Sequence, residues 1–165
     1  MPKIIAVEWP EESDLRPTLD RANYHDAYSA PLADDRLSPV EIFLRASRAT
    51  PAWVALLMAF RNTVVRRLGL KDVGAMSSHA GKPAEAYAVG DRLGIFSVYE
   101  IHADELVLGI DDSHLDVRVS ILKRPGRYFV STVVTVHNWL GRLYMMPVGK
   151  IHPFVVRAAM RRTKV

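Results

Sequence analysis

The spacing of apolar residues along the chain changes from a helical period to a strand period. Residues 8–37 are polar and rich in turn formers, and within them residues 24–32 alternate in a way that predicts a strand. Pro31 would end this strand or confine it to a sheet edge. Ser38-Pro39-Val40-Glu41 has the composition of a capping box, which predicts a helix from there to about Ser47.

A second helix is predicted after Thr50-Pro51. Its apolar residues recur every three or four positions, which predicts one stripe that faces a core. The residues of the stripe are Trp53, Leu56, Leu57, Phe60, Val64 and Leu68. Residues 70–92 follow with several glycine and proline breakers, so we expect a loop there.

From residue 94 the apolar period shortens to two, which is the period of half-buried strands. Residues 94–101 and 105–111 predict a hairpin, and residues 115–121 and 127–137 predict two further strands around a Pro125-Gly126 turn. Because these connections are short, we expect an antiparallel sheet. Extrapolated pairing places eight apolar residues on one face, the predicted core. They are Leu106, Leu108, Leu115, Val117, Val119, Ile121, Val130 and Val134.

The residues after Asn138 return to helical spacing, but Pro147 and Pro153 argue against one uninterrupted helix. We therefore expect a last helix over residues 151–162, with an irregular or short helical segment before it. The complete order predicts an α+β fold: a strand, two helices, an antiparallel meander, and a C-terminal helix that covers the apolar face of the sheet. No repeat or linker divides the 165 residues, so we expect one domain.

Composition narrows the class of protein. The chain is 49% hydrophobic and contains no cysteine, which excludes a disordered protein, disulfides and cysteine-ligated metal sites. The longest uncharged apolar run, residues 52–60, is far shorter than the roughly 20 residues that span a bilayer. The first residues lack the pattern of a secretory signal. We therefore expect a soluble, cytoplasmic protein without a membrane partner.

The net charge of +4 conceals a polarity along the chain. Residues 117–165 contain ten Lys or Arg and no Asp or Glu, whereas the first 116 residues are net acidic. Arg157, Arg161, Arg162 and Lys164 suit the C-terminal end of a helix. No stacking platform or nucleic-acid motif accompanies these cations, so we expect no nucleic-acid partner. The two regions are expected to complement each other within the molecule.

Several short motifs are distributed over nearly the whole chain. They are Tyr24-x-Asp26-x-Tyr28, Thr50-Pro51-x-Trp53, Arg61-Asn62-x-Val64-Val65, Asp112-x-His114-Leu115-Asp116-x-Arg118, Gly141-Arg142-x-Tyr144 and His152-Pro153-Phe154. Together they resemble the bacterial domain of unknown function 2867 family over residues 20–162, which leaves residues 1–19 as an N-terminal segment.

This resemblance implies no established activity. Members of that family occur alone or fused to nicotinamide-dinucleotide-binding domains, and the present sequence has no Gly-x-Gly-x-x-Gly motif, so no cofactor is expected. The order of elements also resembles the helix-grip architecture of the birch-pollen-allergen and lipid-transfer superfamily. That resemblance implies a sheet wrapped around a long helix, often with an apolar cavity between them.

The first group of candidate site residues lies at the start of one predicted strand. Asp112, His114, Asp116, Arg118 and Ser120 share one face because a strand has period two. A histidine beside carboxylates can act as a general base or as a metal ligand. An Asp/Arg alternation is also the ordinary solvent face of a half-buried sheet, and the extrapolated register places Asp116 and Arg118 opposite the apolar face.

The second group lies near the last helix and consists of Arg142, Tyr144 and His152, with His137 at the end of the preceding strand. A Tyr hydroxyl and a His can orient the polar end of a ligand at a cavity mouth. The same residue types also form ordinary structural hydrogen bonds. The histidines lack the spacing of a helical metal motif, so no metal site is predicted.

Three functional hypotheses follow, and they leave open whether the chain is an enzyme. The first is a small-molecule binding domain that holds a hydrophobic or amphipathic ligand between sheet and last helix, lined by Trp53, Tyr144, His152 and Phe154. The second is a cyclase or hydratase type of enzyme with His114–Asp116 or His152–Tyr144 as its acid–base pair. The third is an interaction protein with a filled core. A homodimer is compatible with each.

Overall fold

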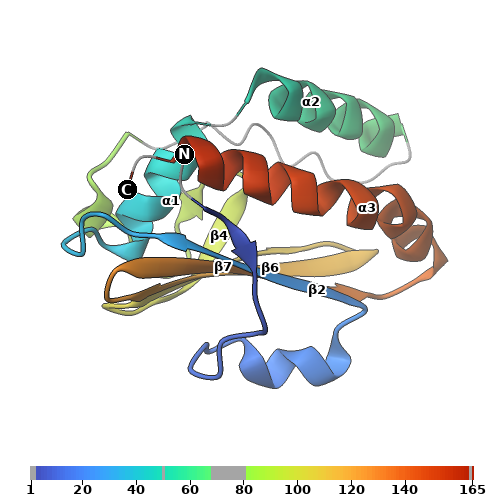
Figure 1. Cartoon of the computed structure of the whole chain (residues 1–165). Helices are drawn as coiled ribbons and strands as arrows, with labels where there is room; N and C mark the ends of the chain where they lie inside the picture. Colours follow the sequence, from blue (N-terminus) through green and yellow to red (C-terminus); the bar gives the residue numbers. More distant parts are fainter. Residues whose placement is uncertain (1–2, 50, 68–80, 164) are drawn as a thin grey trace.

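The fold is an α+β arrangement of one antiparallel sheet with helices on one face and the N-terminal segment on the other (Figure 1). The structure is a computed structural model that describes residues 3–49, 51–67, 81–163 and 165. The strands are β1 (Ile5–Ala6), β2 (Tyr24–Pro31), β3 (Arg92–Leu93), β4 (Phe96–Ile101), β5 (Glu105–Asp111), β6 (Leu115–Arg124) and β7 (Arg127–Val136). The helices are α1 (Pro39–Arg48), α2 (Ala52–Arg67) and α3 (Trp139–Arg162), with short 3-10 turns η1 (Arg16–Arg21) and η2 (Ala84–Ala86).

The seven strands are ordered β1-β2-β7-β6-β5-β4-β3, so the first long strand pairs with the last. Val119 of β6 lies between Leu108 of β5 and Thr132 of β7, and the next position on the same face, Ile121, lies between Leu106 and Val130. This register confirms the predicted apolar face and the predicted fold class. It also places Asp26 of β2 on that face, opposite Thr132.

Helix α1 begins as predicted. The Ser38 hydroxyl accepts a hydrogen bond from the Glu41 N–H at 3.2 Å, and the Glu41 carboxylate accepts one from the Ser38 N–H at 2.7 Å. The helix then buries Ile42 completely and packs Phe43 edge-on against Phe96 of β4. These contacts fix α1 over one end of the sheet and leave the other end to α3.

Helix α3 corrects the prediction of a helix limited to residues 151–162. It is one helix of 24 residues in which both Pro147 and Pro153 are accommodated. Asn138 caps its start by accepting a hydrogen bond from the Gly141 N–H at 3.1 Å. Pro147 lies on the exposed side, where water can satisfy the carbonyl oxygen that a missing N–H leaves unbonded. The contact with the sheet therefore outweighs the local cost of the two prolines.

Helix α2 corrects a second prediction, because its apolar stripe does not face the core. Val54 is 2% exposed, but Leu56 is 71% exposed and Phe60 67% exposed. The side chain of Val64 and residue Leu68, which belong to the same predicted stripe, lie outside the described residues. Helical spacing identifies residues that share one side of a helix, but it does not reveal what that side meets.

The opposite face of the sheet is covered by the N-terminal segment and η1. Trp9 and Leu15 pack there against Ala27, Val107 and Val133 and form a second, smaller apolar cluster. The buried carboxylate of Glu105 fixes this segment, because it accepts hydrogen bonds from the Ser13 hydroxyl at 2.7 Å and the Asp14 N–H at 2.9 Å. The sheet is thus covered on both sides.

Among the described residues, no helix has both the length and the apolar character needed to cross a membrane.

Candidate functional site

The best-formed polar cluster on the inner face of the sheet joins β2 to the middle of α3. The Asp26 carboxylate lies 2.9 Å from Nδ1 of His152, and the same oxygen accepts a hydrogen bond from the Tyr24 hydroxyl at 2.8 Å. The Tyr24 and His152 rings meet edge to face, with their centres 5.7 Å apart. Two groups capable of proton exchange, a phenol and an imidazole, therefore contact one carboxylate oxygen.

Sequence and backbone explain why these side chains meet. Tyr24 and Asp26 are two positions apart on β2, so both project toward α3. Gly149 lies on the same side of α3 as His152 and faces the Tyr24 ring, with which an added Cβ would be in ordinary van der Waals contact at 3.5 Å. The side chain of Asp26 is 11% exposed and that of His152 is 24% exposed. The cluster is therefore largely shielded from water, although the His152 side chain remains partly exposed to solvent.

Tyr28 and Arg157 extend the cluster along the helix toward its C-terminal end. The Arg157 guanidinium lies over the Tyr28 ring, 5.1 Å from its centre. Two polar atoms here are buried and have no hydrogen-bond partner among the described residues: Oδ1 of Asp26 and Nε of Arg157. Buried polar atoms are normally hydrogen-bonded, so this pair marks a place where a further polar group would be stabilised.

The two tyrosines of the cluster are held in their neutral form. Burial raises the pKa of Tyr24 most strongly, and the hydrogen bond to Asp26 and the charge of that carboxylate raise it further. Burial also raises the pKa of Tyr28, and the Asp26 charge adds to this effect while Arg157 opposes it. Tyr24 therefore remains a hydrogen-bond donor at neutral pH.

The apolar surface beside this cluster is not fully covered by α3. Of the 24 residues of the helix, Gly141 and Met160 are the buried ones. Several sheet residues that face the helix from the central strands stay partly exposed. These are Ile110, Val117, Val119 and Val130. A polar cluster thus borders a partly accessible apolar sheet face.

His114 and Tyr144, two of the predicted site residues, contact each other at the start of α3. Their rings meet edge to face with centres 5.6 Å apart, and His114 is 1% exposed. The Asp112 carboxylate lies 3.4 Å from His114 Nδ1, but the geometry does not make a hydrogen bond, and neither ring nitrogen has a partner among the described residues. His152 lies two helical turns from Tyr144, about 12 Å along the axis.

Several residues of the sequence motifs hold the turn at His114 against the start of α3. The His114 carbonyl oxygen accepts a hydrogen bond from the His137 N–H at 3.0 Å and touches the first turn of α3 at Gly141. The Ser113 carbonyl accepts a hydrogen bond from the Asn138 side chain at 3.0 Å. The turn between β5 and β6 is thereby fixed to the start of α3.

Asp116 and Arg118 lie on the opposite face of the sheet from the inner cluster, as the extrapolated register predicts. Asp116 pairs with His137 at 2.9 Å rather than with His114. The Arg118 guanidinium pairs with Asp111 at 2.7 Å and stacks on Tyr99 at 4.0 Å from the ring centre. Both residues therefore belong to surface networks on that face.

Trp53 and Phe154 also lie away from the inner cluster. Trp53 is 43% exposed on α2, and Phe154 is 66% exposed on the solvent side of α3. His152 is thus the one predicted site residue that the structure brings into the cluster with Asp26 and Tyr24. Tyr24 and Asp26 could have been placed together from the motif Tyr24-x-Asp26-x-Tyr28, because alternate positions of a strand share a face.

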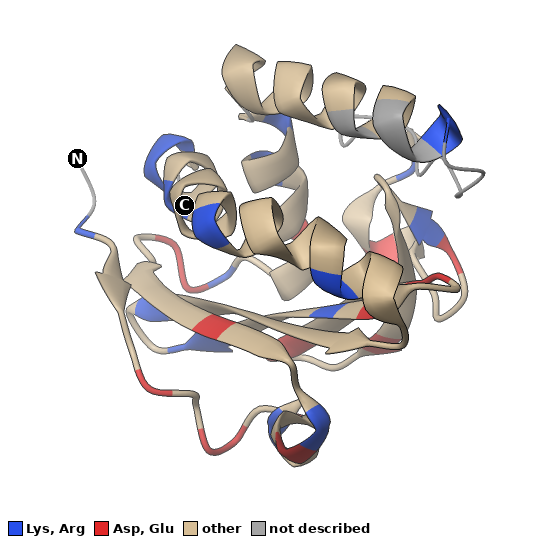
Figure 2. Ribbon diagram, turned by 90° about the vertical axis from the view of Figure 1, so that its right-hand side faces the viewer, with Lys and Arg blue, Asp and Glu red and all other residues tan. Residues whose placement is uncertain are grey.

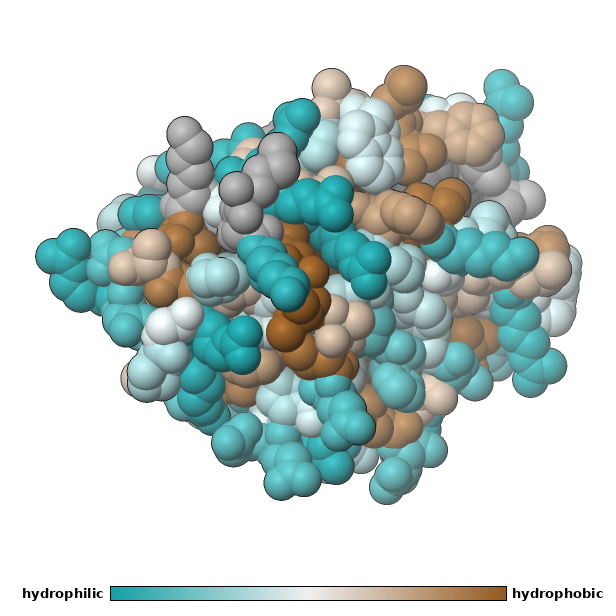
Figure 3. Space-filling model, in the orientation of Figure 1, coloured by the Kyte–Doolittle hydropathy of each residue, from teal (hydrophilic) through white to brown (hydrophobic). Residues whose placement is uncertain are grey.

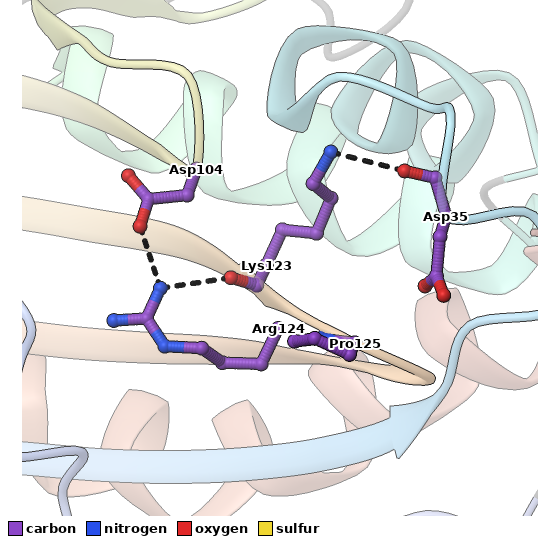
Figure 4. Close-up of a pocket in the computed structure, with 5 residues that line it drawn as sticks. All are labelled: Asp35, Asp104, Lys123, Arg124 and Pro125. Atoms are coloured by element: carbon purple, nitrogen blue, oxygen red, sulfur yellow. Dashed lines mark hydrogen bonds and ion pairs between the residues drawn. The ribbon is translucent and has the colours of Figure 1, made fainter.

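A separate hollow of about 250 Å³ lies at the turn between β6 and β7 (Figure 4). Its charged groups are already engaged in hydrogen bonds and one ion pair. Arg124 pairs with Asp104 at 2.6 Å, and the Lys123 ammonium donates to the Asp35 carbonyl at 3.2 Å and to the Leu37 carbonyl at 3.1 Å. These bonds fix the turn against the segment before α1, so the hollow is less suited to a polar ligand than the inner cluster.

One group of metal-ligating side chains escaped the sequence analysis. Donor atoms of Asp14, Glu100 and His102 lie within 4.8 Å of one another, and all three residues are exposed. His102 Nε2 lies 3.3 Å from Asp14 and 3.4 Å from Glu100, so a protonated imidazole would pair with both carboxylates. Glu100 and His102 are two positions apart at the end of β4, whereas Asp14 comes from the N-terminal segment, so no sequence spacing reveals the group of three.

The comparison with protein families identifies the family of the chain. The model of the family described as protein of unknown function (DUF2867) matches residues 18–159, and the chain belongs to this family. No match was found among curated proteins or among solved structures.

Proposed function

We propose that this protein binds an amphipathic small molecule between α3 and the inner face of the sheet. The observation that carries the proposal is the cluster of Tyr24, Asp26 and His152 beside a partly exposed apolar surface. Ligand pockets commonly combine such apolar walls with a few convergent polar groups. The helix-grip resemblance of the sequence supports the same location.

The chemistry of the cluster suggests how a ligand would be oriented. An apolar body would lie on Val119 and Val130, where burial of apolar area is favourable by about 25 cal/mol per Å². A polar end that donates a hydrogen bond would satisfy Asp26 Oδ1, and an acceptor would satisfy Arg157 Nε. A ligand with an uncharged or zwitterionic polar end fits this pairing of one anion with one cation.

A second function, acid–base catalysis, is favoured by one specific contact. An imidazole that donates from Nδ1 to a carboxylate carries its lone pair on Nε2, which can take a proton from a bound molecule. Tyr24, neutral at physiological pH, could return a proton or stabilise a developing oxyanion. This pair differs from His152–Tyr144 and His114–Asp116, because the partners are Asp26 and Tyr24.

The binding proposal is tested by native mass spectrometry of the protein purified from its own source. We expect a retained small molecule that is lost in Asp26→Asn and His152→Ala and kept in the matched surface control His102→Ala. Titration with the fluorescent amphiphile 1-anilinonaphthalene-8-sulfonate should show the same ranking of the four proteins. A wild-type protein that retains no molecule and binds no probe would contradict the proposal.

The catalytic alternative needs one further measurement. The retained molecule is incubated in excess with wild-type protein and with His152→Ala, and its mass is followed over time. Conversion by the wild type alone would establish an enzyme, whereas an unchanged mass with both proteins would leave binding as the function.

A further inference from the structure

One side of α2 carries a stripe of apolar side chains that stay exposed, because no described residue covers them. Trp53, Leu56, Leu57 and Phe60 follow the spacing i, i+3, i+4, i+7, so they lie on one side of the helix. Their exposed fractions range from 37% for Leu57 to 71% for Leu56. Exposed apolar residues in such a continuous stripe mark an interaction surface rather than isolated surface residues.

The solvent side of α3 has the same character. Trp139, Leu143, Met146 and Phe154 are each more than half exposed on the side of the helix away from the sheet. The exposed Lys150 lies on the same side, one turn after Met146. In the space-filling view apolar side chains lie at the surface over α2, and hydrophilic and apolar side chains alternate along α3 (Figure 3). We call the solvent sides of α2 and α3 the helical face.

The charge of the helices decides which partner fits the helical face. Helices α1, α2 and α3 together contain ten Lys or Arg and one acidic residue, Glu41. The rest of the chain is net acidic, since the whole chain carries only +4. Figure 2 shows this separation, with blue segments but almost no red on the helices and most red segments on the sheet and N-terminal side. The molecule is therefore polarised across its two layers.

Charge complementarity distinguishes between possible partners. A second copy placed on the helical face would bring two strongly positive layers together, which is electrostatically unfavourable. Nucleic acid would neutralise the cations but would leave aliphatic side chains such as Leu56 and Leu143 without a matching surface. Interfacial helices that bind membranes combine Trp, Phe and Leu on one side with Lys and Arg around them.

We propose, contrary to the expectation from the sequence of no membrane partner, that the helical face binds peripherally to the surface of an anionic lipid bilayer. Leu56 and Phe60 would enter the boundary between headgroups and acyl chains, where their apolar area leaves water. Arg67 at the end of α2 and Lys150 of α3 would pair with anionic headgroups. The acidic side of the molecule then faces away from the bilayer.

The test is flotation of the full chain with vesicles of phosphatidylcholine mixed with phosphatidylglycerol, compared with vesicles of phosphatidylcholine alone. We expect binding to the anionic vesicles and little to the neutral ones, with a loss of binding as salt is raised. Leu56→Glu combined with Phe60→Glu should abolish flotation, and Lys150→Glu should weaken it about tenfold.

Two matched variants separate this surface from general changes in polarity and charge. Val89→Glu introduces a carboxylate at a residue that is 66% exposed outside the helices, and Arg21→Glu reverses a charge on η1, on the opposite side of the sheet. Both should float like the wild type, with circular dichroism confirming that every variant is folded. Equal binding of all variants, or no binding to anionic vesicles, would overturn the proposal.

A further measurement identifies the competing occupants. Analytical ultracentrifugation that shows a dimer disrupted by Leu56→Glu with Phe60→Glu would assign the helical face to a second copy and overturn bilayer binding. Asp26→Asn, which removes the ligand-site carboxylate, should still float. Failure of the ligand site and failure of membrane binding are therefore distinguishable.

Discussion

The imidazole of His152 lies 2.9 Å from the carboxylate of Asp26, although the two residues are 126 positions apart in the sequence. This contact joins α3 to β2. Strand β2 pairs with β7, which is the last strand of the meander. The contact is part of a direct polar bridge between α3 and β2. The same two residues define the polar end of the proposed ligand site.

A double-mutant cycle should measure this contact. Asp26→Asn and His152→Ala each remove one partner, and the double variant removes both. Because the Asp26 side chain is 11% exposed, we expect a coupling energy of about 0.5–3 kcal/mol. Urea denaturation at neutral pH gives the three differences in free energy of unfolding. Additive effects of the two substitutions would show that the contact contributes no net stability.

Two glycines of α3 should respond in opposite directions to the same substitution. A Cβ at Gly141 would lie 2.2 Å from the His114 carbonyl oxygen, so Gly141→Ala forces the β5–β6 turn away from the helix and should cost about 1–3 kcal/mol. At Gly149 the nearest atom is at 3.5 Å, and Gly149→Ala should stabilise the helix by up to about 1 kcal/mol. Thermal unfolding of both variants checks the pair, and destabilisation of equal size would refute the close approach at Gly141.

Tyr24 should lose its phenolic proton only at a pH well above the ordinary tyrosine pKa. Its pKa is raised by burial and by Asp26, so the folded protein holds the phenolic proton more tightly than the unfolded chain does. The resulting stability is fully present below the ordinary tyrosine pKa of about 10 and is lost as pH rises above it. Phenolate absorbance should show a late-ionising group that Tyr24→Phe removes. Tyr128, whose pKa burial raises to about 12, should remain in that variant.

Acid should remove the contribution of the outer pair Asp111–Arg118. Burial alone would raise the pKa of Asp111, but hydrogen bonds from Tyr99 and Arg118 outweigh it and the net pKa is lowered. Stability from this carboxylate is therefore present above its ordinary pKa of 3.8 and is lost as pH falls below that value. Asp111→Asn should be less stable than wild type at pH 7 by less than about 1 kcal/mol, because the pair is half exposed. The difference should disappear in strong acid, as followed by urea denaturation.

Removing the buried carboxylate of Glu105 should release the N-terminal segment. Glu105 is 2% exposed and accepts hydrogen bonds from Ser13, Asp14 and Ser120. Glu105→Ala leaves three donors without an acceptor, which should cost several kcal/mol at about 1–3 kcal/mol for each buried group left unsatisfied. Limited proteolysis should then cut within residues 8–22 faster than in the wild type. Unchanged cleavage would show that the apolar contacts of Trp9 and Leu15 hold the segment without Glu105.

The predictable parts of the fold are those determined by neighbouring residues. Period two on β5, β6 and β7, together with the Pro125-Gly126 turn, determined the hairpins and the face on which Val119 and Ile121 lie. The capping box of Ser38 and Glu41 determined the start of α1. Each of these signals acts over a few residues, and the register of a short hairpin follows from its turn.

The candidate site was only partly predictable. His152 was a candidate on sequence grounds and the Tyr24-x-Asp26-x-Tyr28 motif was visible, but nothing local connects them. Their contact requires β2 to pair with β7 and α3 to cross β2, and both are long-range events. The pairs His114–Asp116 and His152–Tyr144 were natural choices from proximity in sequence. The structure instead directs Asp116 to His137 across the other face.

The amino-acid sequence alone therefore determined which residues share a strand face or a helix side, since local geometry repeats with a known period. Apart from the covering of the sheet by the C-terminal helix, which the order of elements predicted, tertiary structure alone decided what each face meets. It accommodated Pro147 and Pro153 within α3 because a long helix gains contact with the sheet, and it turned the apolar stripe of α2 outward because α1 and α3 already cover the sheet. Periodicity specifies which apolar residues lie on one side of an element. Which of these apolar sides is buried depends on how all elements pack together.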